Sequence, residues 1–388
     1  MFIKRILIYF PIVLILFLAQ SFFWVPTYDE QALGNPERLK KYIRASSGDA
    51  ETLNPLISAD TASSSINSLV FDGLIALDDK LEYRPRLATS WTQSEEAFLV
   101  VDPRYRLEKI EKKLPNSMDW LHYIKKLLEK TPQGIGNLKS IDLVPGLVVE
   151  GSVQVPISGR NGSPEELQGR SLMKPIFYTL RYPDRIKFTL NHIDQDFFNP
   201  IKKWIGEEYF EKFPYDDFIS AKKKSQYNLL KTNFAKILPL TEHNPIISFN
   251  LRRGVRFHDG HEFDSGDVLF TYRSIMNVKT ASPRRSDYEP VKHALADGPY
   301  KAIITYKRLF SSAINSWSMG ILPEHLLNEE ALNKEALVNK NDSKKFNIRD
   351  SQFNRKPIGT GPFRFAEWRS DEIIRLERND DYWEGPPE

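Results

Sequence analysis

The chain of 388 residues contains no cysteine. This absence excludes disulfide bonds, thiolate metal sites, a cysteine nucleophile and a lipid-bearing cysteine, so we do not expect a lipoprotein. Net charge is small as well, since 54 basic residues stand against 51 acidic ones and leave +3. Near-neutrality gives no argument for a nucleic-acid partner, and we expect none. The length leaves room for two or more domains.

Several catalytic signatures are also missing from the sequence. It has no GxSxG nucleophile turn, no GxxxxGK[ST] phosphate loop, no GxGxxG dinucleotide motif and no HExxH metal helix. The segment IGTGPF (358–363) has two glycines followed at once by proline, which favours a tight backbone turn over a phosphate cradle. We therefore expect no enzyme, no cofactor and no bound metal.

Charged residues are absent from a stretch near the N-terminus. Lys4 and Arg5 precede the uncharged segment 6–25, which is typical of an export signal, with small residues allowing cleavage after Ser21. The same segment is long enough to span a bilayer, so an uncleaved anchor that keeps the protein on the inner membrane is the alternative. Residues 1–25 are thus a signal peptide or membrane anchor. Both interpretations place the rest in the periplasm, after a polar linker at 26–42.

Two histidines at 258 and 261 flank Asp259-Gly260 and raise the question of a metal site. A zinc site requires further ligands on a rigid frame, whereas Asp-Gly is typical of a turn. Apolar residues alternate along 247–251 before it, which predicts a strand. Asp264 and Asp267 after it predict a capped helix start. We therefore interpret the segment as a turn between a strand and a helix.

Other local patterns predict further elements. Asp60 is a candidate helix cap, and Asn116 or Ser117 is another. Residues 174–190 are compatible with a hairpin that turns at Pro183-Asp184, and 363–378 with a hairpin whose loop is 369–372.

Three blocks in order resemble one family. They are ETLNPLISADTASSSINSLVFDGL and its continuation (51–91), LRRGVRFHDGHEFDSGDVLFTYRSIM (251–276) and IGTGPFRFAEWRSDEIIRLERNDDYWEGPP (358–387). This combination is similar to the family 5 extracellular solute-binding proteins, the oligopeptide-, dipeptide- and nickel-binding components of ABC importers.

The resemblance implies a mixed α/β (α+β) fold, that of the first lobe of a type II periplasmic binding protein. Residues 43–95 would form the first segment of lobe I and 246–388 its continuation. The family normally joins these segments by a short connection, so 96–245 is expected to be an inserted α+β module. By the same resemblance, we expect the given sequence to lack the second lobe, as a fragment or a truncated product would.

The resemblance also implies a function. Such a protein captures peptides or a similar small solute in the periplasm and delivers them to ABC transporter permease subunits, by binding and hinge motion without chemistry. The alternative is a membrane-tethered scaffold or sensor that keeps the fold without transport. Candidate substrate-binding residues lie in two loops, for which purely structural turns are the alternative: Thr52, Leu53, Asn54, Pro55, Gly359, Thr360 and Gly361.

Overall fold

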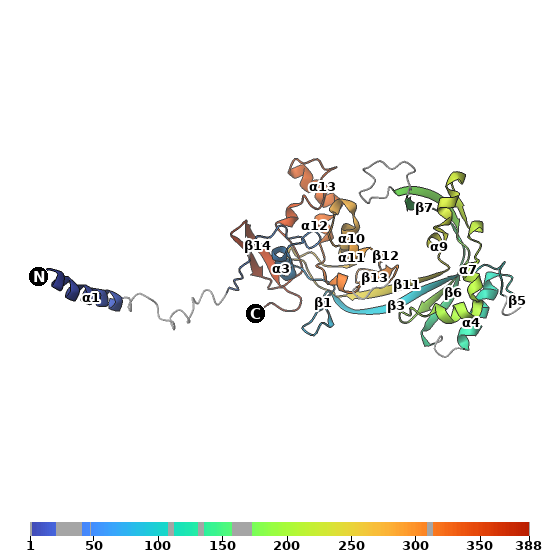
Figure 1. Ribbon diagram of the computed structural model, residues 1–388, viewed down its shortest axis with the longest axis horizontal. Helices are drawn as coiled ribbons and strands as arrows, with labels where there is room; N and C mark the ends of the chain where they lie inside the picture. Colours follow the sequence, from blue (N-terminus) through green and yellow to red (C-terminus); the bar gives the residue numbers. More distant parts are fainter. Residues whose placement is uncertain are drawn as a thin grey trace. The chain divides into compact units, whose positions relative to one another are not determined.

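The structure is a computed structural model that describes residues 2–20, 41–46, 48–107, 112–130, 136–156, 173–308 and 313–387. The chain divides into two compact units, residues 1–49 and 50–388 (Figure 1). The first unit holds helix α1 (Phe2–Gln20). The signal peptide or anchor stays a prediction, because residues 21–25 and most of the linker lie outside the described residues.

A search of the described helices found none with the length and apolar character needed to cross a membrane.

The second unit is built on a six-stranded antiparallel sheet in the order β12-β13-β11-β3-β9-β6 (Figure 1). A three-stranded sheet has the order β10-β8-β7, and three two-stranded pairs complete the β structure. The strands are β1 (Ile75–Leu77), β2 (Tyr83–Pro85), β3 (Ala88–Val100), β4 (Arg106–Leu107), β5 (Lys112–Lys113), β6 (Leu138–Val144), β7 (Val148–Pro156), β8 (Met173–Arg181), β9 (Arg185–Leu190), β10 (Ile219–Ala221), β11 (Thr241–Leu251), β12 (Val291–Ala296), β13 (Lys301–Tyr306), β14 (Phe363–Arg369) and β15 (Ile373–Arg378).

Short helices cover these sheets, which gives the mixed α/β class that the sequence predicts. They are α3 (Thr61–Val70), α4 (Ser117–Glu129), α6 (Phe198–Ile205), α7 (Glu207–Glu211), α8 (Tyr227–Lys231), α9 (Phe234–Ile237), α10 (Ser265–Met276), α11 (Arg285–Tyr288), α12 (Glu324–Leu327) and α13 (Glu329–Val338). Single 3-10 turns are η5 (Tyr215–Asp217), η6 (Lys224–Gln226), η7 (Val278–Thr280), η8 (Asn315–Ser318) and η9 (Gln352–Asn354).

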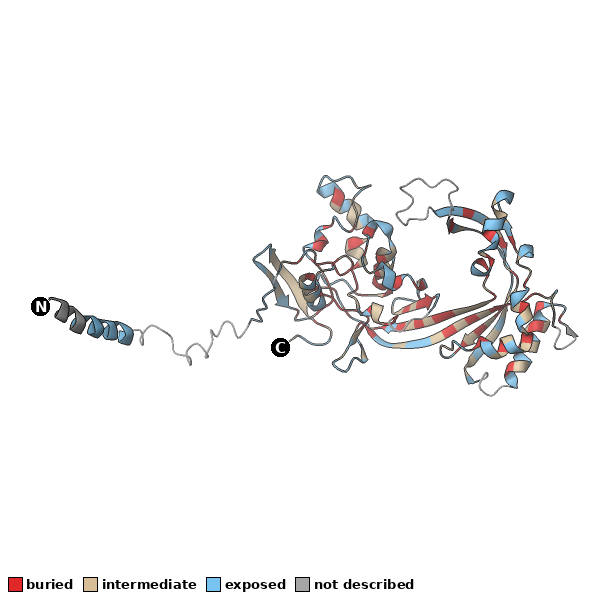
Figure 2. Ribbon diagram, viewed as in Figure 1, coloured by how far each residue is buried: buried red, intermediate tan, exposed pale blue. Residues whose placement is uncertain are grey.

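Two hydrophobic cores lie in the second unit. One is formed by buried side chains from 56–88 and 247–353, and the other by side chains from 97–240. Strands β3 and β11 contribute to the first core and extend toward the second, with pairing from Thr241↔Leu99 to Leu251↔Ala88 (Figure 2). The predicted boundaries at 95/96 and 245/246 both fall inside these paired strands. The inserted module at 96–245 and the lobe assignment therefore stay predictions.

The expected hairpin at Pro183-Asp184 is wrong. Strands β8 and β9 do not pair with each other. Instead, β8 pairs with β7 and β9 pairs with β6, so the chain bends at Pro183-Asp184 as it passes from the three-stranded sheet into the six-stranded sheet. The bend is held by Asp184, whose carboxylate accepts the Gly146 N–H at 2.8 Å and the Ser117 hydroxyl at 2.6 Å. A Cβ at Gly146 would stand 2.3 Å from the Tyr182 carbonyl oxygen, so the close approach of the two segments requires glycine.

The predicted helix caps are confirmed. Asp60 accepts the Ser63 N–H at 2.7 Å, and Asn116 caps α4 through the Asp119 N–H at 2.9 Å. The hairpin of β14 and β15 forms as expected, and the strand expected at 247–251 is the end of β11.

Helix α10 begins with a complete capping box. The Asp264 carboxylate accepts the Gly266 N–H at 2.6 Å, and the Asp267 carboxylate accepts the Asp264 N–H at 3.0 Å. The other oxygen of Asp267 accepts the Glu324 N–H at 2.8 Å and so ties α10 to the start of α12. Burial raises the pKa of Asp267 to about 6, because these hydrogen bonds only partly offset the loss of water.

Tyr382 and Trp383, near the end of the chain, are anchored to residues 51–91 by the buried carboxylate of Asp72, which is 2% exposed. It forms an ion pair with Arg86 and accepts the Trp383 indole N–H at 2.9 Å and the Tyr382 hydroxyl at 3.4 Å. The guanidinium of Arg252 lies over the Trp383 ring, 4.3 Å from its centroid. We call Asp72, Arg86, Tyr382 and Trp383 the Asp72 cluster.

Candidate functional site

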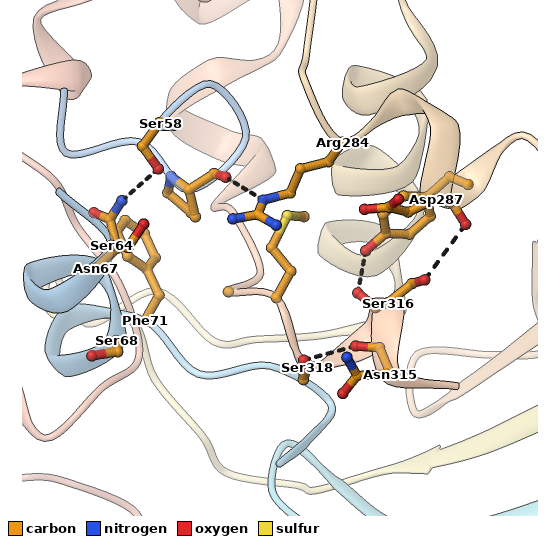
Figure 3. Close-up of a pocket in the computed structure, with 14 residues that line it drawn as sticks. Ser58, Ser64, Asn67, Ser68, Phe71, Arg284, Asp287, Asn315, Ser316 and Ser318 are labelled. Carbon is orange, nitrogen blue, oxygen red and sulfur yellow. Dashed lines mark hydrogen bonds between the residues drawn. The ribbon is translucent and has the colours of Figure 1, made fainter. Parts of the chain in front are cut away.

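A pocket of about 420 Å³ opens beside helix α3 in the second unit (Figure 3). A concave site of this size suits a small solute. One wall comes from Pro55, Ser58 and helix α3. The other comes from Arg284 and α11, together with η8 and the two residues after it. The lining residues are Pro55, Ser58, Ser64, Asn67, Ser68, Phe71, Arg284, Asp287, Tyr288, Asn315, Ser316, Ser318, Met319 and Gly320.

The α3 wall is polar because Ser64, Asn67 and Ser68 of the helix line the pocket. Asn67 is buried, and its amide N–H donates to the Ser58 hydroxyl at 3.1 Å. That bond fixes the amide, so its oxygen Oδ1 is left without a hydrogen-bond partner among the described residues. Phe71 closes the end of this wall and fits tightly against Gly320, where an added Cβ would lie 2.4 Å from the Phe71 Cβ.

The opposite wall is held by Tyr288. Its hydroxyl donates to the Ser316 carbonyl oxygen, and burial raises the pKa of Tyr288, so the phenol stays protonated. Next to it, Asn315 also has a buried amide oxygen with no partner within the described part of the chain. Two amide oxygens in one pocket thus lack donors. Both oxygens are buried beneath the pocket surface, so a solute in the pocket does not reach them while these side chains keep their arrangement.

Arg284 enters the pocket between these walls, as Figure 3 shows. Its Nε donates to the Pro55 carbonyl oxygen at 3.4 Å, which orients the guanidinium. No described carboxylate forms an ion pair with it. Asp287 also lines the pocket and is exposed, so the site contains both signs of charge.

The first predicted loop lies at this pocket but contributes only Pro55 to its lining. Leu53 and Asn54 are 0% exposed. The Leu53 N–H donates to the Asn354 carbonyl at 2.8 Å, and the Asn54 amide donates to the Asn354 side chain at 2.9 Å. The Thr52 N–H donates to Ser63 Oγ at 3.3 Å, while its own buried hydroxyl has no partner among the described residues.

The second predicted loop, Gly359–Gly361, does not line the pocket. The Gly361 N–H donates to the Val70 carbonyl at 2.9 Å, and the Thr360 hydroxyl accepts the Asp72 N–H at 3.3 Å. A Cβ at Gly359 would stand 2.0 Å from the Val70 oxygen, so glycine is required by this contact. The loop supports the end of α3, and a binding role for either predicted loop stays a prediction.

His258 lies in the predicted turn and holds the Gly359–Gly361 loop in place. Its Nδ1 accepts the Gly359 N–H at 3.3 Å and its Nε2 donates to the Gly361 carbonyl at 2.9 Å, a pattern that requires the neutral ring. Burial lowers the pKa of His258, which favours that neutral state.

His261 stacks on His325 with ring centroids 3.8 Å apart. The Nε2 of His325 lies 2.7 Å from the Asp259 carboxylate. A search of the described residues found no group of three or more histidine, aspartate or glutamate side chains placed to hold a metal ion.

No sequence pattern singles out Asn67, Arg284 or Asn315 as site residues. One usable signal was present: TASSSINS (61–68) forms a helix whose polar positions carry hydroxyl and amide groups but no charge. Such a surface is unusual for a solvent-exposed helix, which normally carries charged residues.

Comparison with known proteins shows a similarity in the C-terminal part of the chain. Residues 241–388 match the family described as bacterial extracellular solute-binding proteins, family 5 Middle. The oligopeptide-binding protein AppA of Bacillus subtilis is 35% identical over 142 residues, which is 35% of this chain and 23% of that protein. Protein XP55 of Streptomyces lividans is 30% identical over 159 residues, covering 41% of this chain and 26% of its own length. The chain thus spans about a quarter of the length of these relatives.

Solved structures of similar proteins include AppA from Bacillus subtilis in complex with a nonapeptide, with a TM-score of 0.41 and 20% identity over 88% of this chain and 37% of that one. NikZ from Campylobacter jejuni in complex with Ni(L-His) gives a TM-score of 0.39 and 16% identity over 86% of this chain and 34% of that one. The family resemblance stated from the sequence is confirmed for residues 241–388.

Proposed function

We propose, from the premise that residues 241–388 belong to the family 5 extracellular solute-binding proteins, that this chain captures peptides or a similar small solute outside the cytoplasm. It then delivers the solute to the permease subunits of an ABC transporter in the inner membrane. The process is binding and release without chemistry, which agrees with the lack of a catalytic signature in the sequence. Export through residues 1–25, whether cleaved or retained as an anchor, is part of the same proposal.

The pocket beside α3 supports this proposal most directly. Several hydroxyl groups and a guanidinium surround one space, and this set can hydrogen-bond a polar solute from several sides. The pocket joins segment 55–71 to residues 284–320 of the family-matched part. We therefore place the solute here, at the surface that α3 and η8 present.

Calorimetry of the full chain with a pool of random tripeptides tests the proposal. A Ser68→Trp variant places a large ring on the pocket side of α3 and is expected to weaken binding at least tenfold. Ser286→Trp is the matched control, because Ser286 is exposed on α11 and does not line the pocket. Binding of equal strength in both variants would show that the solute does not bind in this pocket. Absence of peptide binding by the wild-type chain would refute peptide capture.

Co-purification from membranes distinguishes transport from the alternative of a tethered scaffold or sensor. Recovery of ABC permease subunits is expected. Recovery of unrelated envelope proteins without any permease would contradict delivery to a transporter.

A further inference from the structure

A second pocket, of about 540 Å³, shares no lining residue with the pocket beside α3. It lies between α10, η7, the helices α12 and α13, and the segment 343–348, all within the family-matched residues. We call it the α10–α13 pocket. Its volume is in the range of sites that hold a small organic molecule, and the proposed capture of a solute beside α3 makes no use of it.

The walls of the α10–α13 pocket are held by hydrogen bonds between segments that are distant in the sequence. The Arg349 guanidinium donates to the Thr280 carbonyl oxygen at 2.9 Å, which ties the end of segment 343–348 to η7. The buried amide of Asn354 donates to the Ile348 carbonyl oxygen at 2.9 Å. These bonds hold the segment against the rest of the fold, so the pocket does not depend on a bound molecule for its shape.

Apolar side chains line the pocket on several sides. They are Phe270 from α10, Leu327 from α12, Leu332 from α13, and Phe346 and Ile348 from the segment 343–348. Leu327 and Ile348 are buried in the hydrophobic core, whereas Phe346 is half-buried and belongs to neither core. An apolar ligand that covered the Phe346 ring would remove more of its surface from water, which favours binding.

Cationic and hydroxyl groups line the side where η7 meets the segment 343–348. Lys279 and Lys344 are exposed there, and neither ammonium has an ion-pair partner among the described residues. Thr280, next to Lys279, also lines the pocket and is 3% exposed. Its hydroxyl has no hydrogen-bond partner in the described part of the chain, yet it is not enclosed by protein atoms. A negatively charged oxygen at this side would meet two ammonium groups and one hydroxyl donor.

A single carboxylate, Glu329, is found among the lining residues of this pocket. It lies in the first turn of α13, where the helix dipole favours a negative charge. Two lysines against one glutamate leave one net positive charge on the lining. The α10–α13 pocket therefore favours an anionic ligand over a cationic one.

We propose that the α10–α13 pocket binds a small amphiphilic carboxylate. The apolar body of the ligand lies against Phe346 and the other apolar lining residues, and its carboxylate lies between the ammonium groups of Lys279 and Lys344. An apolar molecule without charge would leave both lysines unpaired, and a fully polar anion would leave the Phe346 ring uncovered. This site is separate from the proposed peptide capture, so neither depends on the other.

Calorimetry of the full chain with octanoate as the probe tests the proposal. Octanol and octylamine are the matched neutral and cationic probes, because they carry the same apolar chain. The double variant Lys279→Gln/Lys344→Gln removes both ammonium groups from the pocket. The double variant Lys340→Gln/Lys345→Gln is the matched control, because these two lysines are exposed and do not line the pocket.

The wild-type chain and the control variant are expected to bind one octanoate per chain, about fivefold more tightly than octanol and more tightly still than octylamine. The Lys279→Gln/Lys344→Gln variant is expected to lose the preference for octanoate, with its affinity for octanol unchanged. Equal affinities of the wild-type chain for octanoate and octanol, a preference for octylamine, or an equal loss in both double variants would overturn the proposal. Absence of saturable octanoate binding would overturn it as well.

A pair of tryptophan variants tests the location. Asn333→Trp places a large ring on the α13 wall of the pocket and is expected to abolish octanoate binding. Val338→Trp is the matched control, because Val338 ends the same helix, is 80% exposed and does not line the pocket. Octanoate binding of equal strength in both variants would show that octanoate binds elsewhere on the chain and would overturn the proposal.

Discussion

Replacing Asp72 by alanine removes the acceptor at the centre of the Asp72 cluster. The carboxylate is paired with Arg86, whose side chain is 13% exposed, and with the Trp383 N–H at 2.9 Å. Breaking a buried pair by removing one partner costs about 3–5 kcal/mol. Arg86 keeps Glu384 at 2.7 Å and Tyr382 at 2.8 Å, so we expect the lower end, about 3 kcal/mol of unfolding free energy.

The assay is urea unfolding followed by tryptophan fluorescence, with Asp380→Ala as control. Asp380 is exposed and, among the described residues, forms an ion pair with Arg378 alone, so its loss should change the unfolding free energy by less than about 0.5 kcal/mol. Adding Arg86→Met to Asp72→Ala should recover part of the loss, because the uncompensated cation is removed. A loss below about 1 kcal/mol for Asp72→Ala would show that the cluster does not anchor residues 382–383 to the first block.

Three further outcomes follow from the same structure. Asp264→Ala should cost about 1 kcal/mol through the lost cap of α10, measured by urea unfolding, and an unchanged midpoint would contradict the capping role. Gly359→Ala should lower the unfolding free energy by about 3 kcal/mol, because the added Cβ would lie 2.0 Å from the Val70 oxygen. Gly136→Ala is the control and should be neutral, since nothing lies within 4 Å of its Cβ. Equal stabilities of the two variants would refute the contact. The pKa of Asp267 is about 6 in the folded chain against an ordinary 3.8, so the folded chain holds the proton more tightly than the unfolded chain. This contribution to stability is fully present below pH 3.8 and is lost as pH rises through 6. Unfolding at pH 4 to 7 should therefore show the stability of the wild-type chain falling relative to Asp267→Asn, by up to about 3 kcal/mol, and a constant difference would contradict it.

Local features of the fold could be predicted because short segments determine them. The caps at Asp60, Asn116 and Asp264 each depend on a side chain and an N–H no more than three residues away. The hairpin at 363–378 likewise depends on a short loop between two apolar runs. The hairpin predicted at Pro183-Asp184 does not form, because a turn dipeptide does not determine which segment pairs with the strand beside it. Here Asp184 bonds to Gly146, 38 residues earlier, so the chain bends instead of reversing.

The pocket could not be predicted for the same reason. It combines residues 55–71, 284–288 and 315–320, and no local pattern connects them. The predicted Gly359–Gly361 loop was singled out for its glycines, but these residues permit close backbone contact with Val70 beneath the end of α3. His258 was correctly placed in a turn, whereas its hydrogen bonds to Gly359 and Gly361 depend on a segment 101–103 residues away.

Hydrogen–deuterium exchange of the full chain, with and without a saturating pool of free-acid tripeptides, tests the location of solute binding most directly. If the solute binds between α3 and η8, the amides of residues 61–71 and 315–320 should exchange more slowly in its presence, and those of β7, β8 and β10 should be unaffected. Protection confined to β7, β8 and β10, with α3 and η8 unchanged, would contradict the proposed site and move binding to the three-stranded sheet.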